Sequence, residues 1–378
     1  METLVYLDNS STTKPCQKAV ENINRALCKN WGNPSSLHIL GVNAEQEVNN
    51  ARMLAAKKLR CKPQEIIFTS SGTEANNTAI IGAVMKNAKR GKRIVTTSIE
   101  HPSVLETVKR FENQGFEVVY LKPDSSGAVP LEEVQKSVTE DTILLSMMLV
   151  NNETGAIQPV EQAAKILHEK SKNGLFHCDA VQAFGKLPFV PSQLDVDMLS
   201  VSGHKIHGPK GVGFLYKKQG VHIPPLLTGG GQESGMRSST ESVPLIAGLA
   251  GALEELPDIK SQLEKQTELW QYAARRLAES GFAAINSDEN CLPYILNVSV
   301  VGYRSETLLH FLESQNVFVS SGSACAKGEG SYVLREMGLN AARTDSALRL
   351  SFSRYNTAQD VDKLIDALNG ATQKLRKV

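Results

Sequence analysis

The sequence lacks the features that mark several common protein classes. Its six cysteines include no Cys-x-x-Cys pair, which argues against a zinc ribbon, a thioredoxin-type dithiol and a dense disulfide framework. No apolar run approaches the roughly 18 residues of a membrane span, and the start METLVYLDNSSTTKP has no basic segment followed by an apolar core. We therefore expect a cytoplasmic protein that binds no structural metal and does not enter a membrane.

The chain also lacks an excess of charge of either sign. Its 41 basic and 40 acidic residues nearly cancel, so no global field attracts nucleic acid or an anionic membrane. It has no basic stripe interleaved with aromatic residues either. These absences favour a small molecule as the partner. With 378 residues, the chain is long enough for a large core and a second, smaller unit.

Short β-branched runs alternate with amphipathic stretches through the first two thirds of the chain, which is typical of a parallel α/β sheet. The last two runs of this part are too close together for a helix between them, so we expect some antiparallel pairing there. The pattern predicts a mainly parallel seven-stranded sheet, with strands at 65–70, 92–98, 116–121, 142–150, 175–180, 196–202 and 211–217.

The C-terminal third has a different pattern, helical first and then mixed. Helices are expected at 243–256 and 260–280, and a small α+β unit follows, with strands at 294–302, 317–322 and 347–353 and helices at 305–315 and 357–375. We predict a large domain over 14–255 and a smaller domain formed by 1–13 and 256–378.

Chemistry-bearing residues follow several of the predicted strands. Ser202, His204 and Lys205 come directly after the strand at 196–202, and strand ends are where α/β folds build sites. A lysine there can form a Schiff base with a carbonyl cofactor if its pKa is lowered. The alternative is an ordinary surface lysine, and Lys210 in the following turn is a candidate for that role.

Two further strand ends carry polar residues. Gly72 and Thr73, in the turn before a predicted helix, could direct backbone N–H groups and a helix dipole toward a phosphate, or could form an ordinary helix cap. Asp179 and Gln182 follow the strand at 175–180. There, Asp179 could keep a pyridine nitrogen protonated, or it could cap a helix.

The remaining candidates also leave alternatives open. His101 could stack on a flat ring and move protons, whereas Asn151 could bind a ring hydroxyl or substrate, or simply form a turn. Cys325 lies in the polar segment VFVSSGSACAKGEG, where a thiol is able to ionise, and the other five cysteines lack such a setting. Arg349 could form a two-pronged pair with a carboxylate or a structural ion pair.

Taken in order, the segments LDNSSTT, GNPSSLH, FTSSGTEANN, TTSIEHPSV, VNNETG, HCDAVQAFGK, SGHKIHGPKGVG, GGGQESGMRSSTES and SSGSAC resemble the NifS/IscS-type cysteine desulfurases of the class-V aminotransferase family. The resemblance runs nearly from end to end. It implies a fold-type-I transferase that depends on pyridoxal 5'-phosphate and converts L-cysteine to L-alanine. SSGSAC narrows it to members in which a cysteine takes up the sulfur as a persulfide.

The resemblance also assigns roles to individual residues. Lys205 would be the Schiff-base lysine, Cys325 the persulfide-forming nucleophile and His101 the stacking, proton-handling residue. The cofactor would be held by Gly72, Thr73, Asn151, Asp179, Gln182, Ser202, His204 and Lys205, with Arg349 and Asn151 facing the substrate. Thr240 would reach the phosphate of a neighbouring subunit, which implies a homodimer.

The implied partners and the rival functions complete these expectations. The sulfur would pass to an acceptor protein, either an iron–sulfur scaffold or a tRNA-thiolation enzyme. A selenocysteine lyase or another β-lyase with the same cofactor would not need Cys325. A non-catalytic assembly module of the same fold would turn over no substrate at all.

Overall fold

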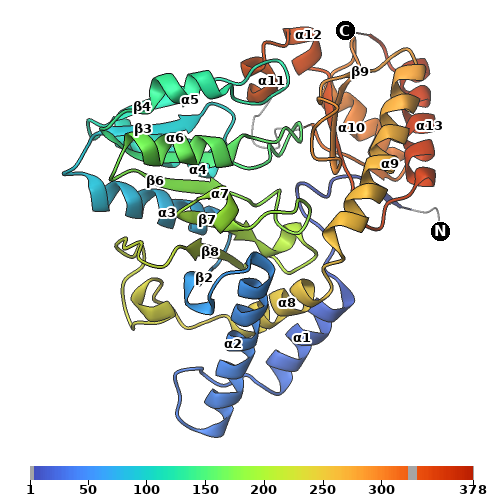
Figure 1. Ribbon diagram of the computed structural model, residues 1–378. Coiled ribbons are helices and arrows are strands. Elements are labelled where there is room, and N and C mark those ends of the chain that lie inside the picture. The colour runs from blue at the N-terminus through green and yellow to red at the C-terminus, as the bar shows by residue number, and fades with distance from the viewer. Residues whose placement is uncertain (1–3, 322–329, 378) are drawn as a thin grey trace.

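A computed structural model describes residues 4–321 and 330–377 of the chain. Cys325 therefore lies outside the described residues. The described part contains a large layered unit and a smaller unit beside it, joined through the α8–α9 connection and through the N-terminal segment (Figure 1).

A seven-stranded sheet forms the centre of the large unit. Its strands are β2 (Ile66–Thr69), β3 (Arg93–Thr97), β4 (Glu117–Leu121), β5 (Thr142–Met148), β6 (Leu175–Asp179), β7 (Met198–Ser202) and β8 (Gly213–Lys217). They lie in the order β2-β8-β7-β6-β5-β3-β4. Only β8 runs antiparallel to its neighbours β2 and β7. The mainly parallel seven-stranded sheet predicted from the sequence is confirmed, including the antiparallel pairing of its last two strands.

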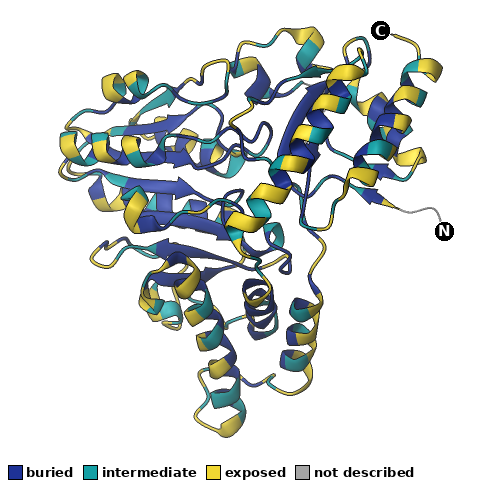
Figure 2. Cartoon of the chain, turned by 45° about the vertical axis from the view of Figure 1, so that its right-hand side comes forward, coloured by how far each residue is buried: buried dark blue, intermediate teal, exposed yellow. Residues whose placement is uncertain are grey.

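Helices cover both faces of this sheet, as parallel sheets require. Neighbouring residues of β3 and β5 belong to different cores: Ile94 and Leu144 pack with α3 (Gly72–Asn87) and α4 (Pro102–Glu112), whereas Val95 and Leu145 share the core that contains α2 (Ile39–Leu59), α6 (Val160–Lys170) and α8 (Val243–Glu254). All seven residues of β5 are buried. Figure 2 shows this arrangement as buried strands between helices with exposed outer faces.

Two N-terminal helices that the sequence analysis did not single out pack on α8. These are α1 (Gln17–Cys28) and α2, which with α8 form a helical layer away from the smaller unit (Figure 1). Short helices α5 (Leu131–Ser137) and α7 (Pro191–Leu194) connect strands of the sheet.

The smaller unit has its own core. The antiparallel strands β9 (Ala284–Ile285), β10 (Ile295–Ser299) and β12 (Ala347–Ser351) are accompanied by a parallel pair, β1 (Val5–Tyr6) and β11 (Val317–Phe318). Its helices are α9 (Ile259–Glu279), α10 (Ser305–Ser314), α11 (Tyr332–Glu336), α12 (Ala341–Thr344) and α13 (Ala358–Lys374). Of the strand expected at 317–322, β11 contains Val317 and Phe318, and Ser320 beyond it forms an isolated bridge with Arg349.

The second core draws Val5 and Leu7 from the start of the chain and its other members from residues 269–371. A division of the chain into 14–255 and 1–13 with 256–378 remains our prediction for the domain limits. Among the residues that the structure describes, no helix has the length and apolarity to cross a membrane.

Candidate active site

A cavity of about 510 Å³ opens at the carboxyl ends of the parallel strands. Residues that follow β2, β3, β5, β6 and β7 line it, together with the N-terminal segment and strand β12 of the smaller unit. Nine of the residues singled out in the sequence lie on its wall: Gly72, Thr73, His101, Asp179, Gln182, Ser202, His204, Lys205 and Arg349. The strand-end rule thus brings together side chains that are up to 277 positions apart, the separation of Gly72 and Arg349 in the printed sequence.

Lys205 ends a short 3-10 turn (η2, Gly203–Lys205) immediately after β7. Its Nζ donates hydrogen bonds to the carbonyl oxygens of Ser10, at 2.5 Å, and Ser11, at 2.8 Å. Burial lowers the pKa of Lys205 to about 8, and the positive charge of Arg349 acts in the same direction. Lys205 is therefore an amine that is neutral for part of the time near physiological pH, as a Schiff-base lysine must be.

Asp179 is held in the cavity by one donor on each oxygen. Its Oδ1 accepts from the backbone N–H of Val181 at 2.9 Å, and its Oδ2 accepts from Nδ2 of Asn76 at 2.7 Å. Asn76 also donates to Oγ of Ser103 at 2.9 Å. Asn76 was not among the residues predicted from the sequence, although it lies four residues after Gly72 in α3 and thus on the same helical face.

His101 caps the N-terminus of α4 and faces the cavity. Its Nδ1 accepts a hydrogen bond from the backbone N–H of Ser103 at 3.1 Å and lies 2.8 Å from the Ser103 hydroxyl. Because Nδ1 is an acceptor there, the proton of the neutral ring is on Nε2. Burial lowers the pKa of His101, Lys205 lowers it further, and Asp179 opposes this shift.

The first turn of α3 forms the end of the cavity best suited to an anion. Ser71 caps the helix, with its Oγ accepting from the backbone N–H of Glu74 at 3.2 Å. The next two backbone N–H groups, of Gly72 and Thr73, point along the helix dipole toward the cavity. Burial, followed by the charge of Lys205, lowers the pKa of His204 to about 4, so His204 is neutral and able to donate one hydrogen bond.

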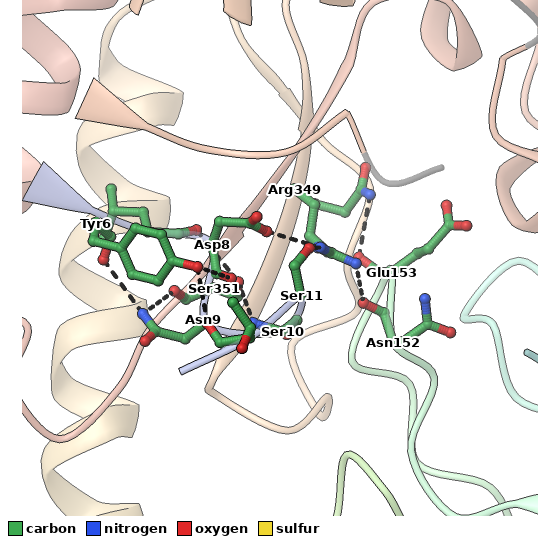
Figure 3. A network of polar contacts seen from close by, with 12 residues as sticks. Tyr6, Asp8, Asn9, Ser10, Ser11, Asn152, Glu153, Arg349 and Ser351 are labelled. Atoms are coloured by element: carbon green, nitrogen blue, oxygen red, sulfur yellow. Dashed lines mark hydrogen bonds and ion pairs between the residues drawn. The ribbon is translucent and has the colours of Figure 1, made fainter. Parts of the chain in front are cut away.

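Arg349 occupies the opposite side, on β12 (Figure 3). Its Nη2 donates to Oδ1 of Asp8 at 2.9 Å and to Oγ of Ser11 at 2.5 Å, and its Nη1 donates to the carbonyl oxygen of Asn152 at 3.1 Å. Within the described part of the chain, its Nε is buried without a hydrogen-bond partner. Arg349 nevertheless lines the cavity, so its guanidinium places a fixed positive charge beside the space that a ligand would occupy.

Asn151 does not line the cavity, in contrast to the expectation from the sequence. Its Nδ2 donates to the carbonyl oxygen of Ile99 at 3.0 Å, while its Oδ1 accepts from the backbone N–H groups of Glu153 and Thr154. An amide that closes its own turn has little left for a ligand. The next residue, Asn152, lines the cavity instead, and its Oδ1 is buried without a partner in the described part of the chain.

Thr240 is another predicted residue that does not line the cavity. It is exposed in the loop before α8. The loop is tied to the large unit by two ion pairs, Arg52 with Glu233 at 2.7 Å and Arg237 with Glu74 at 2.8 Å. Cys325 is outside the described residues, as stated above.

Comparison with known proteins identifies this arrangement. Residues 5–364 match the family described as aminotransferase class-V. The chain belongs to the class-V aminotransferase family, in its NifS/IscS group of cysteine desulfurases. It is 40% identical over 379 aligned residues to a cysteine desulfurase of Nostoc sp., covering 99% of this chain and 94% of the relative.

Solved structures agree with this membership. A NifS-like protein, 39% identical, superposes with a TM-score of 0.94 and covers 99% of this chain and 100% of its own. A structure described as SspA in complex with cysteine is 34% identical, with a TM-score of 0.83 over 94% of this chain and 100% of its own. The fold-type-I architecture of the family and that of this chain are therefore the same.

Proposed function

We propose that the cavity holds pyridoxal 5'-phosphate on Lys205 and that the protein removes the sulfur of L-cysteine, releases L-alanine and keeps the sulfur on Cys325 as a persulfide. The observation that carries the proposal is the pairing within one cavity of a buried lysine of lowered pKa with the anchored carboxylate of Asp179. A relative whose structure is described as a complex with cysteine supports the choice of substrate.

The residues present fit this cofactor. The N-terminus of α3 and the neutral His204 offer donors for a phosphate, the imidazole of His101 offers a wall for a flat ring, and the carboxylate of Asp179 suits a protonated pyridine nitrogen. A side chain at Gly72 would crowd the phosphate end, since an added Cβ would lie 2.8 Å from Cγ2 of Val181. When bound, the cofactor would accept the electron pair that remains on the substrate's α-carbon when the α-proton leaves.

The chain's own residues then divide the remaining tasks. Arg349 would bind the substrate carboxylate through its guanidinium, with Asp8 and Asn152 fixing the plane of that group. Lys205, once released, would be a neutral amine in position to take the α-proton and return it. His101 would hold a proton on Nε2 at the ring face, because its Nδ1 is occupied by the backbone of α4.

The sulfur step would be a displacement at the sulfur atom of the substrate. The thiolate of Cys325 forms a new S–S bond as the C–S bond breaks, and the electron pair of that bond returns to the substrate carbon, which is protonated to give alanine. Two contacts hold the described residues on either side of positions 322–329 beside the cavity. Ser320 pairs with Arg349 through both backbone groups, and the Ser331 hydroxyl donates to the buried carboxylate of Glu153, a cavity residue.

The proposed partners rest on the family alone. The sulfur acceptor would be an iron–sulfur scaffold protein or a tRNA-thiolation enzyme, in the cytoplasm. A homodimer would bring Thr240 to the phosphate of the neighbouring subunit. Trp31 and Leu37, between α1 and α2, and Ile39, at the start of α2, are exposed apolar side chains. They offer a contact surface for a partner protein.

The test examines the covalent bond between Lys205 and the cofactor and the sulfur–sulfur bond on Cys325. Protein loaded with pyridoxal 5'-phosphate is reduced with borohydride and mapped by mass spectrometry, and the adduct is expected on Lys205 and absent in Lys205→Ala. Incubation with L-cysteine should release alanine and add one sulfur to the peptide that contains Cys325. Cys28→Ser, which changes an exposed cysteine in α1, serves as the matched control.

The same experiment separates the rival functions. Retained alanine release from cysteine and from selenocysteine in Cys325→Ser would rule out the persulfide route in favour of a lyase. A protein that binds the cofactor on Lys205 but converts neither amino acid would be a non-catalytic module. An adduct on another lysine would overturn the proposal altogether.

A further inference from the structure

A second lysine, Lys186, is buried behind the active-site cavity without a counter-ion. Its side chain is only 6% exposed, and in the described part of the chain it forms no ion pair. Its one hydrogen bond runs from Nζ to Oε1 of Gln182 at 3.3 Å, and its amine lies 5.7 Å from the ring centre of Tyr294. A buried amine without a carboxylate normally costs stability, so its presence requires an explanation.

The charged groups near Lys186 are cations. Burial lowers the pKa of Lys186 to about 7, and the nearby charges of Lys205 and Arg349 act in the same direction. Lys186 also shares the lining of a small cavity of about 30 Å³ with Lys205, His207 and Arg354. No carboxylate is among the residues described there, so Lys186 adds nothing to an ion-pair network that would stabilise the fold.

Lys186 contacts Gln182, which faces the cofactor cavity. Gln182 lines that cavity, and its Nε2 donates to the carbonyl oxygen of Ser10 at 3.0 Å. The same carbonyl accepts from Nζ of Lys205. The four residues therefore form one chain of bonds, from Lys186 through Gln182 and the Ser10 carbonyl to the amine of Lys205.

The donors and acceptors in this chain allow only one orientation of the Gln182 amide. A backbone carbonyl can only accept, so the NH₂ end must face Ser10. The oxygen end then faces Lys186, whose amine can donate to it whether protonated or neutral. One N–H of Gln182 is used by Ser10, which leaves its second N–H for an acceptor in the cavity. Without Lys186, the oxygen end would lose its donor, and the Ser10 carbonyl would be the remaining described contact that restrains the amide.

We propose that Lys186 is a positioning residue, which fixes the Gln182 amide with its free N–H toward the cavity, where it binds the ring oxygen of pyridoxal 5'-phosphate. This inference rests on the proposed function, because it names what the oriented amide binds. Lys186 touches neither the substrate nor the cofactor and acts through Gln182 alone. The burial of Lys186 lowers the stability of the fold, and this loss is tolerated because the residue orders the binding site.

The test is a double-mutant cycle on cofactor affinity. Apoproteins of the wild type, Lys186→Met, Gln182→Ala and the double variant are titrated with pyridoxal 5'-phosphate, and each dissociation constant is measured by fluorescence. Gln182→Ala should weaken binding about tenfold, as expected for one hydrogen bond in a buried site. Lys186→Met should weaken it severalfold in the wild type and leave Gln182→Ala unchanged, because the two residues act as a unit.

Two controls separate positioning from a structural role. Lys210→Met replaces an exposed lysine five residues beyond Lys205 and should bind as the wild type does. The melting temperature of the Lys186→Met apoprotein should equal or exceed that of the wild type, since an apolar isostere replaces an unpaired buried amine. Lys186→Leu repeats the test with a second apolar side chain that cannot donate to Gln182.

The outcomes distinguish this inference from the proposed function. Failure of the wild type to bind the cofactor on Lys205 would overturn the proposed function. Wild-type binding with an unaffected Lys186→Met, or with effects of Lys186→Met and Gln182→Ala that simply add, would overturn the inference alone. Loss of folding in both Lys186 variants would show that the amine serves stability, which would also overturn it.

Discussion

Asp8 and Arg349 lie 341 positions apart in the sequence, yet Oδ1 of Asp8 is 2.9 Å from the guanidinium of Arg349. The pair joins the segment after β1 to strand β12 at the edge of the cavity (Figure 3). Since Arg349 is nearly inaccessible to solvent and Asp8 only partly so, the ion pair is desolvated and the guanidinium is fixed before any substrate arrives.

This geometry predicts a strong effect of Arg349→Lys. A lysine keeps the positive charge but not the planar fork, and so cannot hold Asp8, Asn152 and a substrate carboxylate together. We expect kcat/KM for L-cysteine to fall about 100-fold, mainly through KM, as for the loss of one or two charged hydrogen bonds. Steady-state alanine release checks this, with Arg304→Lys, remote from the cavity lining, as the control. An unchanged KM would show that Arg349 does not bind the substrate.

Asn76 should be required for turnover although no element of the sequence pattern marked it. Among the described residues, its Nδ2 is the only side-chain donor to Asp179, and it also bonds Ser103, which in turn contacts His101. Asn76→Ala removes both bonds, and we expect kcat to fall by roughly tenfold or more. The adjacent Asn77 instead bonds the carbonyl oxygens of Thr73 and Ser103, so Asn77→Ala should stay within about twofold. Equal effects of the two variants would contradict this assignment.

Glu100 should make the protein less stable as the pH rises. It is fully buried, its Oε1 accepts from the backbone of Met148 and from Thr97, and burial raises its pKa from 4.5 to about 8. The folded state therefore retains a proton that the unfolded chain loses above pH 4.5, so the free energy of unfolding falls between these two values by at most about 1.4 kcal/mol per pH unit.

Glu100→Gln removes this titration and should flatten the dependence. Denaturant unfolding at pH 5, 6, 7 and 8 measures the free energy, and the difference between the wild type and Glu100→Gln is the informative quantity because other groups titrate in both. Glu106→Gln changes an exposed carboxylate of α4 and serves as the control. A difference that does not vary with pH would show that Glu100 is ionised when folded.

His168 should contribute a second, separate pH dependence. Its Nδ1 lies 2.9 Å from Asp195 and its Nε2 lies 3.1 Å from Asp197, and only the imidazolium can donate to both. Bonding to Asp197, then to Asp195, raises the pKa of His168 above its ordinary value of 6.5 against the effect of burial. Because the folded pKa is raised, this stabilisation is complete below pH 6.5 and is lost as the pH rises through the folded value.

The raised pKa of folded His168 determines how the effect of His168→Asn should depend on pH. The variant should be less stable than the wild type at pH 6, and the gap should narrow toward pH 9, as measured by urea unfolding. His310, which is largely exposed and lies 3.6 Å from Glu313, provides His310→Asn as a control with little expected effect. A gap that widens with pH would contradict a protonated His168.

The sequence alone determined the strands of the main sheet and most of the predicted residues that line the cavity. Short, continuous apolar runs predicted all seven strands of the main sheet, because a strand that is buried on both faces needs apolar residues at successive positions. The carboxyl ends of these strands meet at one edge, so Gly72, His101, Asp179 and Lys205 could be grouped from their positions after strands alone.

Only the tertiary structure decided which polar groups are satisfied and which remain free. Asn151 and Asn152 are neighbours with the same side chain, yet the fold uses the first to close a turn and leaves the oxygen of the second without a partner in the described part of the chain. Likewise, nothing in the local pattern distinguishes Lys186 from an exposed lysine. Its burial against Gln182 arises from contacts between distant segments, and desolvation depends on those contacts rather than on the residue type.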